Sequence, residues 1–155
     1  MAVWIEIRDA LLDEVSQLEA LQLRASVVAS DYREALAAHP EVIHLAAADV
    51  SEQRTRVAMV AGRIAGFAVV LPVRGTRCEL DGLFVEPALM RKGVGRALID
   101  DVLARARVHG VLRIDVIANP TAVDFYTKVG FKRGDAAITQ FGPAFWMHLD
   151  LLPAV

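Results

Sequence analysis

A pair of glycines, Gly93 and Gly95, stands where an apolar segment gives way to a helix-like one, and basic residues surround the pair: Arg91, Lys92 and Arg96. Glycine lets the backbone turn sharply and lets a ligand approach without a Cβ in the way. The start of a helix leaves amide N–H groups without partners and carries the positive end of the helix dipole, which favours an anion such as pyrophosphate. The segment is therefore a candidate phosphate-binding loop, although two glycines before a helix can also serve only as a turn.

This loop matches neither of two common phosphate-binding motifs. A P-loop requires Gly-Lys-Ser/Thr at a fixed spacing, which the sequence lacks. A dinucleotide fingerprint requires Gly or Ala three residues after the second glycine, and Leu98 occupies that position.

Other residues with chemical potential have plain structural interpretations. Tyr126 shares one face of a short helical segment with Ala122, Phe125 and Val129, as a core aromatic would. Asn119 followed by Pro120 is typical of a helix N-cap. Three further kinds of residue are expected to pack or to be solvated rather than to act: the only cysteine, Cys78, which is predicted to point to the opposite strand face from Glu79; Trp146 and Met147; and the histidines His39, His44, His109 and His148. The histidines lack metal-ligand spacing, so no metal site is predicted.

Alternation and helical periodicity predict the elements that would position these residues. Strands are expected over 3–7, 56–60, 64–70, 78–85 and 111–118, and a final pair from Phe131 to about Leu151. Helices are expected over 11–28, 31–38, 93–110 and 120–129, and residues 41–53 are expected to be irregular. Since a helix links strands 78–85 and 111–118, these two should run parallel. Within that helix, Asp101 and Arg105 have the spacing of an ion pair. The fold class is therefore α/β, a mixed central sheet with antiparallel N-terminal strands and flanking helices.

Length and composition are those of one compact domain over residues 1–155, with a net charge of −2 and a mean hydropathy of +0.39. Lysine and arginine are scattered, which argues against nucleic acid as a partner. No apolar run approaches the roughly 20 residues of a membrane-spanning helix, and the N-terminus does not read as a secretion signal. With a single cysteine, these features predict a cytoplasmic protein that is not bound to a membrane.

Two blocks of the sequence resemble the signatures of the GCN5-related N-acetyltransferases. Leu83-Phe84-Val85-Glu86-Pro87 and the later Gly93-Val94-Gly95-Arg96-Ala97-Leu98 look like the acetyl-CoA-binding core of that family. Its pattern is Gln or Arg, two residues, Gly, one residue, then Gly or Ala. Residues 119–131 resemble the second signature, in the order and at the spacing of the family. Met90 departs from the pattern, because it stands where the family prefers Gln or Arg.

The resemblance implies acetyl-CoA as co-substrate, held in a split between the two parallel strands. Its pyrophosphate would lie on Arg91, Lys92, Gly93, Val94, Gly95 and Arg96, and its pantetheine would pair with the backbone near Phe84 and Val85. Family members hold the pyrophosphate mainly through backbone amides, so we expect binding to survive Met90, with Arg91 supplying a side-chain contact. Asn119 is implied as a further coenzyme contact, in addition to its role as a cap.

The resemblance also implies catalytic roles. Tyr126 falls on the tyrosine that points at the coenzyme sulfur and assists the leaving thiolate. A tyrosine has a pKa of about 10 and a thiol about 8.5, so full proton transfer is uphill by roughly 2 kcal/mol, and we predict that Tyr126 donates a hydrogen bond. Glu79 stands where some members carry a glutamate base. It would need a raised pKa or a water relay. Asp81, on the same strand face, is the alternative base. The alternative interpretation is that Glu79 and Asp81 are both solvated strand carboxylates without a catalytic role.

The sequence thus predicts an acetyl-CoA-dependent N-acetyltransferase that moves the acetyl group directly to an amine in a ternary complex. The acceptor is expected to be a small molecule or a peptide, and no motif identifies it. A homodimer is compatible with the family. One alternative is a non-catalytic acyl-CoA sensor or partner-binding module. A weaker one is a nucleotide-phosphate transferase that uses the glycine loop.

Overall fold

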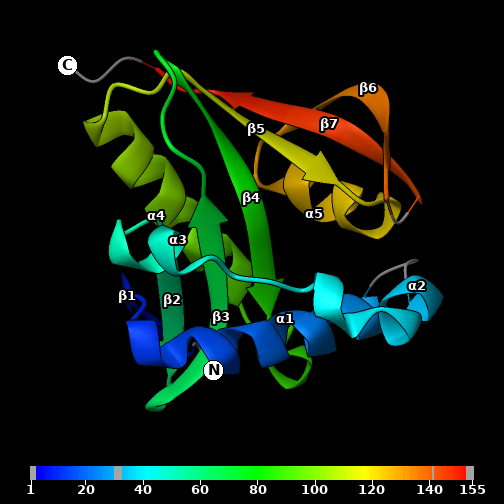
Figure 1. Cartoon of the computed structure of the whole chain (residues 1–155). Helices are drawn as coiled ribbons and strands as arrows, with labels where there is room; N and C mark the ends of the chain where they lie inside the picture. Colours follow the sequence, from blue (N-terminus) through cyan, green and yellow to red (C-terminus); the bar gives the residue numbers. More distant parts are fainter. Residues whose placement is uncertain (1–2, 30–32, 141, 153–155) are drawn as a thin grey trace.

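The computed structural model describes residues 3–29, 33–140 and 142–152, and the strands among them form one seven-stranded mixed sheet (Figure 1). The strands are β1 (Glu6–Asp9), β2 (Thr55–Val60), β3 (Arg63–Val70), β4 (Arg77–Val85), β5 (Arg113–Ala118), β6 (Lys132–Thr139) and β7 (Gly142–Asp150). Their order in the sheet is β1-β2-β3-β4-β5-β7-β6. Only β4 and β5 pair in parallel, and the other neighbours are antiparallel. The predicted α/β class and the parallel pair are confirmed.

Helices lie on both faces of this sheet (Figure 1). They are α1 (Val15–Ala29), α2 (Arg33–Ala38), α3 (Ala47–Ser51), α4 (Val94–Val108) and α5 (Val123–Lys128), with short 3-10 turns at Leu12–Glu14, Pro40–Val42, Pro87–Leu89 and Pro120–Ala122. The larger core cluster packs α4 and α5 against one face, and the smaller packs α1 and α3 against β2 and β3 on the other. No helix of the described residues is long and apolar enough to cross a membrane.

The C-terminal half of the sheet keeps one face without a packed helix layer. On β5 and β7 the alternate side chains that do not enter the core under α4 and α5 include Asp115, Ile117, Trp146 and His148, next to the ion pair of Arg113 and Asp150. Ile117 and Trp146 are 40% and 37% exposed. We call the surface formed by these four residues the open face.

Several predicted boundaries differ from the structure by one or two residues, and three differences are larger. β1 begins at Glu6 rather than at residue 3, because its bounds follow its pairing with β2, from Glu6 opposite Met59 to Asp9 opposite Arg56. The first helix begins only at Val15. Residues 41–53, expected to be irregular, contain the short helix α3, whose one buried side chain leaves no periodic signal.

The predicted end of helix 31–38 and the predicted gap between strands 56–60 and 64–70 both have local causes. α2 ends at Ala38, immediately before His39 and Pro40, although predicted positions 31 and 32 lie outside the described residues. The hairpin between β2 and β3 turns on Ala61 and Gly62, whose φ values of 51° and 76° are those of a tight hairpin turn.

The predicted pair between Asp101 and Arg105 is wrong. Asp101 accepts two hydrogen bonds from Arg56 of β2, both at 3.0 Å. Arg105 instead donates to Asp9 of β1 at 3.2 Å and to the carbonyl of Gln53 at 3.1 Å. An ion pair between two residues of one helix stabilises the helix by only about 0.2–0.5 kcal/mol. The bidentate pair of Asp101 with Arg56 on another element is therefore favoured. The resulting network ties α4 to the first strands of the sheet.

Replacing Asp101 with Asn should lower the free energy of unfolding by about 1–3 kcal/mol, because the largely buried Arg56 loses an ionised acceptor. Urea denaturation at neutral pH measures the change. Asp100→Asn is the matched control, since Asp100 is exposed on the same helix, and it should stay within about 0.5 kcal/mol of the parent. Equal stabilities of the two variants would contradict the prediction.

Candidate active site

Strands β4 and β5 form a fork. They pair only where Arg77–Leu80 run beside Arg113–Val116. Beyond that point β4 continues along β3, whereas β5 continues along β7. Within the described residues, no backbone hydrogen bond joins 81–85 of β4 to 117–118 of β5. The predicted split between the parallel strands is therefore present, and it exposes one backbone edge of each strand.

A β-bulge explains where the fork begins. Val70 of β3 lies opposite Leu80 and Val69 lies opposite Gly82, so Asp81 is an extra residue in β4. A bulge bends its strand and exchanges the faces of the residues that follow. Accordingly Phe84 packs with the α1 cluster, its ring 5.3 Å from that of Phe67. Sequence analysis missed this bulge, which glycine inside a strand, here Gly82, can signal.

The bulge also decides which backbone groups face the fork. The amide of Glu86 donates to the carbonyl of Ala65 on β3 at 2.8 Å. Since antiparallel strands bond at every second residue, Phe84 also turns its backbone toward β3, whereas Leu83 and Val85 turn theirs toward the fork. Of the two residues predicted to contact the pantetheine, Val85 thus turns its backbone toward the fork, whereas Phe84 turns away from it and its neighbour Leu83 takes that position.

Residues 91–96 form an amide-rich loop at the mouth of the fork. Arg91 and Gly93 have φ values of 62° and 87°, and the first helical bond runs from the amide of Ala97 to the carbonyl of Gly93 at 3.0 Å. The amides of residues 91–96 donate no hydrogen bond to any described residue. The side chains of Arg91, Lys92 and Arg96 are exposed, and none forms an ion pair with a described residue. Free amides, free cations and a helix start together favour an anion.

The two sequence blocks meet beside this loop. A Cβ built on Gly95 would lie 3.0 Å from the ring of Phe125 on α5 and 3.7 Å from Val85 on β4. The beginning of α4, the end of β4 and helix α5 therefore converge at one point, and Gly95 leaves just enough room for the ring of Phe125.

Tyr126 is compatible with both interpretations drawn from the sequence, a core aromatic side chain and a hydrogen-bond donor. It is 6% exposed, and its ring makes edge contacts with Phe125 at 5.2 Å and Phe131 at 5.4 Å. Its hydroxyl has no hydrogen-bond partner among the described residues. Burial raises the pKa of Tyr126 above its ordinary value. The hydroxyl is thus free to donate a hydrogen bond and is hard to ionise.

Asn119 acts as a cap, as predicted. Its Oδ1 accepts a hydrogen bond from the amide of Ala122 at 3.0 Å and another from the hydroxyl of Thr121 at 2.6 Å. These bonds occupy the side-chain oxygen and fix the turn that leads into α5.

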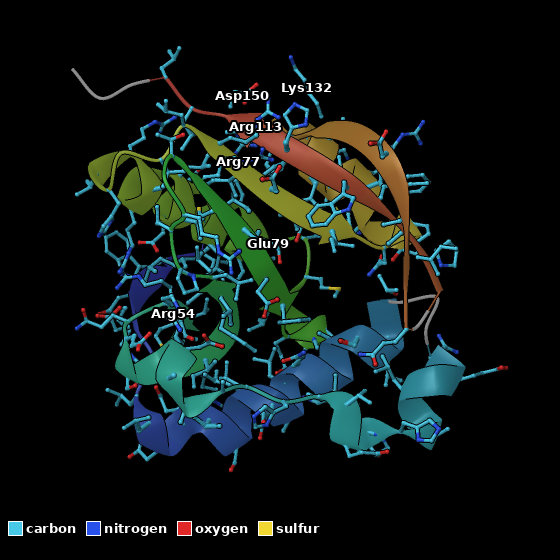
Figure 2. The ribbon with its side chains drawn as sticks, turned by 45° about the horizontal axis from the view of Figure 1, so that its top comes forward. Arg54, Arg77, Glu79, Arg113, Lys132 and Asp150 are labelled. Atoms are coloured by element: carbon cyan, nitrogen blue, oxygen red, sulfur yellow. The ribbon has the colours of Figure 1, made fainter. Side chains whose placement is uncertain are left out.

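Glu79 (Figure 2) lies in the last rows where β4 and β5 still pair, and its register partner on β5 is Asp115. Burial raises its pKa above the ordinary value, the nearby carboxylates of Asp81 and Asp115 raise it further, and Arg74 lowers it. Asp81 is more exposed, and partial burial of its carboxyl also raises its pKa. Of the two predicted bases, Glu79 is the one that lines a cavity.

This cavity has a volume of about 410 Å³ and spreads over the open face. It is lined by Arg77, Glu79, Asp115, Gly134, Asp135, Trp146, Met147 and His148. Trp146 was expected to pack, but it is partly exposed here, whereas Met147 is buried as expected. Sequence analysis could not assemble this set, because the pairing of β5 with β7 brings together residues distant in the chain.

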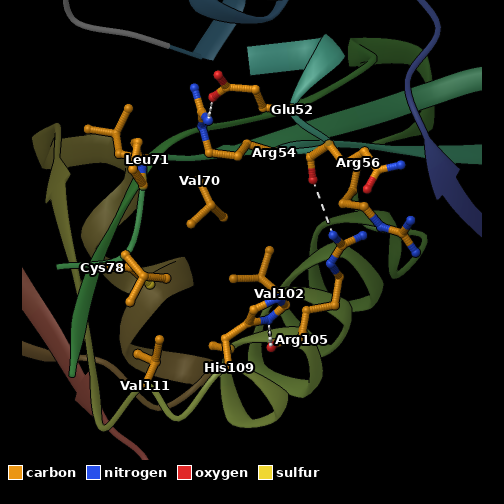
Figure 3. A pocket seen from close by; sticks show the side chains of 14 residues that line it. Glu52, Arg54, Arg56, Val70, Leu71, Cys78, Val102, Arg105, His109 and Val111 are labelled. Atoms are coloured by element: carbon orange, nitrogen blue, oxygen red, sulfur yellow. Dashed lines mark hydrogen bonds and ion pairs between the residues drawn. The ribbon is translucent and has the colours of Figure 1, made fainter. Parts of the chain in front are cut away.

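A smaller cavity of about 190 Å³ lies at the C-terminal end of α4, away from the amide-rich loop (Figure 3). Its arginines are already paired with carboxylates, for example Arg54 with Asp49 at 2.8 Å. Cys78 lines it, on the face opposite Glu79 as predicted, and burial raises the pKa of its thiol to about 11. This cavity contains none of the predicted site residues. Among the described residues, no cluster of His, Cys, Asp and Glu is arranged to hold a metal ion.

Comparison with known proteins agrees with this geometry. The family model described as "Acetyltransferase (GNAT) domain" matches residues 13–146. Serotonin N-acetyltransferase 2, chloroplastic, from Oryza sativa subsp. japonica is 36% identical over 83 residues, which are 48% of this chain and only 40% of the rice protein.

Solved structures agree over nearly the whole chain. A GCN5-related N-acetyltransferase from Rhodopseudomonas palustris has a TM-score of 0.79 at 25% identity, covering 97% of this chain and 99% of that one. The PaiA N-acetyltransferase of Thermoplasma acidophilum, in complex with coenzyme A, has a TM-score of 0.76 at 19% identity, covering 96% and 99%. This chain belongs to the GNAT acetyltransferase family. It is an acyltransferase.

Replacing Glu79 with Gln should not lower the free energy of unfolding at neutral pH and should raise it slightly. A raised pKa means that the folded protein disfavours the ionised carboxylate, so the neutral amide relieves a penalty. As the pH falls through the pKa of Glu79, this advantage should disappear, because the carboxyl is then protonated. Urea denaturation at neutral and mildly acidic pH tests both statements.

The control is Glu14→Gln. Hydrogen bonds from Arg8, at 2.9 and 2.8 Å, lower the pKa of Glu14, so its ionised form stabilises the fold. This variant should lose about 1–2 kcal/mol at neutral pH. A loss of similar size in Glu79→Gln would show that Glu79 has a structural partner instead.

Proposed function

We propose that this chain transfers the acetyl group of acetyl-CoA directly to a primary amine, with both substrates bound at once. The observation that carries the proposal is the continuity between the fork and the amide-rich loop: unpaired backbone groups at Leu83 and Val85 lead toward the unpaired amides of residues 91–96. Such a track suits a ligand that carries amides at one end and a diphosphate at the other.

The residues present fit that ligand. Arg91, Lys92 and Arg96, with the amides around them, would hold the diphosphate, and Leu83 and Val85 would pair with the pantetheine amides as an added strand does. Met90 leaves this arrangement intact, because most of the donors are backbone groups. The coenzyme complex of the PaiA enzyme supports the same assignment.

Glu79 supports the amine-activation step. A lysine-like amine has a pKa of about 10.4, so its neutral form at pH 7 lies about 4–5 kcal/mol above the ammonium. Glu79 would take the ammonium proton, directly or through a water, as the nitrogen forms its bond to the acetyl carbon and the carbon–sulfur bond breaks. Its raised pKa narrows the mismatch with the amine. Asp81, two residues further along β4, is close enough to share the positive charge of the ammonium.

Tyr126 would stabilise the departing thiolate. Its hydroxyl has no competing partner among the described residues, so it can donate a hydrogen bond as negative charge develops on sulfur. Because burial raises the pKa of Tyr126, complete proton transfer is even less favourable than for an ordinary tyrosine.

The direct test joins calorimetry of acetyl-CoA binding to a thiol-release assay with a panel of amines. We expect binding, and release of free thiol only when an amine is present. Arg91→Ala should weaken acetyl-CoA binding by about 3- to 10-fold, in a salt-dependent way. Arg107→Ala, at the far end of α4 and also exposed, is the matched control and should bind as the parent does. Binding without thiol release would favour a sensor, and no binding would refute the proposal.

Tyr126→Phe should reduce kcat by about 10²-fold or more and leave the affinity for acetyl-CoA nearly unchanged, because it removes only the donor to the leaving group. The ring contacts remain, and the hydroxyl has no protein partner to lose, so the free energy of unfolding should change by less than about 1 kcal/mol. Steady-state kinetics and urea denaturation separate the two effects. A normal kcat would restrict Tyr126 to packing.

A further inference from the structure

The cavity on the open face contains features that acetyl transfer alone does not require. Its lining reaches from Glu79 on β4 to Asp135 on β6, across the whole width of β5 and β7. This inference rests on the proposed function, in which the acceptor amine reacts beside Glu79. The remainder of the cavity would then hold the rest of the acceptor molecule.

The charges of this lining are unevenly balanced. Arg77, which is labelled in Figure 2, donates a hydrogen bond to Asp115 at 2.9 Å, and the two groups pair. Glu79 and Asp135 form no hydrogen bond or ion pair with the side chains of the described part of the chain. The cavity thus presents a free carboxylate at each end, with only His148 as a further titratable group of its lining.

A second β-bulge brings Asp135 to this face. Arg133 lies opposite Met147 and Ala136 lies opposite Phe145, so Gly134 and Asp135 together oppose the single residue Trp146. Without the extra residue, regular alternation would place only one of the two beside Trp146. The guanidinium of Arg133 stacks on Phe145 at 5.0 Å, on the opposite face, so it does not neutralise Asp135.

Between the two carboxylates the sheet presents the neighbours Asp115 and His148 and, one alternate row further along the strands, an apolar pair. Ile117 and Trp146 are direct neighbours across β5 and β7, and both are partly exposed. β4 and β6 are separated by three strand spacings, about 14 Å between backbones. An acceptor that contacts both carboxylates must therefore be extended.

We propose that the acceptor is a linear aliphatic amine with a second positive charge. Its reacting nitrogen lies at Glu79, its methylene chain crosses Ile117 and Trp146, and its distal ammonium is held by Asp135. An acceptor with a carboxylate at the distal position would face Asp135 with like charge, and an uncharged end would leave that carboxylate without a partner. The reaction itself is unchanged: the carbon–nitrogen bond forms, the carbon–sulfur bond breaks, and the proton leaves the reacting ammonium.

Three acceptors of equal chain length test the proposal in the thiol-release assay: cadaverine, n-pentylamine and δ-aminovalerate, whose distal groups are positive, neutral and negative. In the parent protein, kcat/KM for cadaverine should exceed that for n-pentylamine by about 5- to 10-fold, as one charge-assisted contact would give. δ-Aminovalerate should be the poorest of the three. The preference should shrink as salt is added, because Asp135 is exposed.

Asp135→Asn should bring the ratio of cadaverine to n-pentylamine close to one. Asp100→Asn, which removes an equal charge from the other side of the sheet, should keep the parental ratio. Thiol release with n-pentylamine and no preference for cadaverine would overturn this inference and leave the proposed function standing. A higher kcat/KM for the aromatic monoamine tyramine than for cadaverine would also overturn it. Release with no amine at all would refute the proposed function and this inference together.

Discussion

The pairing of β4 with β5 cannot continue past Leu80, because Asp81 adds a residue to β4 and bends it away. Backbone groups that face the resulting fork have no partner in the part of the chain that the structure describes, and such groups need water or a ligand. The same bend turns Leu83 and Val85 toward the fork, leaves Glu79 in the last paired rows, and carries β4 toward the loop before α4. This one interruption of the sheet sets the positions of the amide-rich loop, of helix α5 with Tyr126, and of the carboxylates of β4.

Local sequence signals predicted the elements whose causes are local. Pro40 ends α2, Ala61-Gly62 turns the first hairpin, and Asn119 caps the turn before α5, because each acts through its own backbone or side chain. The partner of Asp101 could not be predicted in this way. Arg56 reaches it from a strand 45 positions away in sequence, and only the folded sheet brings the two together.

Strand alternation located Glu79 but failed wherever the period of two was broken. Besides the register shift at Ala65 of β3, two bulges break the period, and each contains a glycine and an aspartate: Asp81-Gly82 and Gly134-Asp135. Each changes which side chains share a face, and each lies beside the candidate site. A strand glycine flanked by a carboxylate was therefore the signal available in the sequence. Its consequence depends on the register of the neighbouring strand, which the sequence alone does not supply.

The modest net charge of −2 conceals a separation of charge within the fold. Unpaired cations and amides lie at the start of α4, whereas the two carboxylates without a partner among the described residues, Glu79 and Asp135, line the cavity over the open face, and the fork lies between these two regions. An anionic coenzyme and a cationic acceptor would each be attracted to one side and repelled from the other. The two substrates could then occupy the fork together without competing for the same groups, which is the condition that direct transfer in a ternary complex requires.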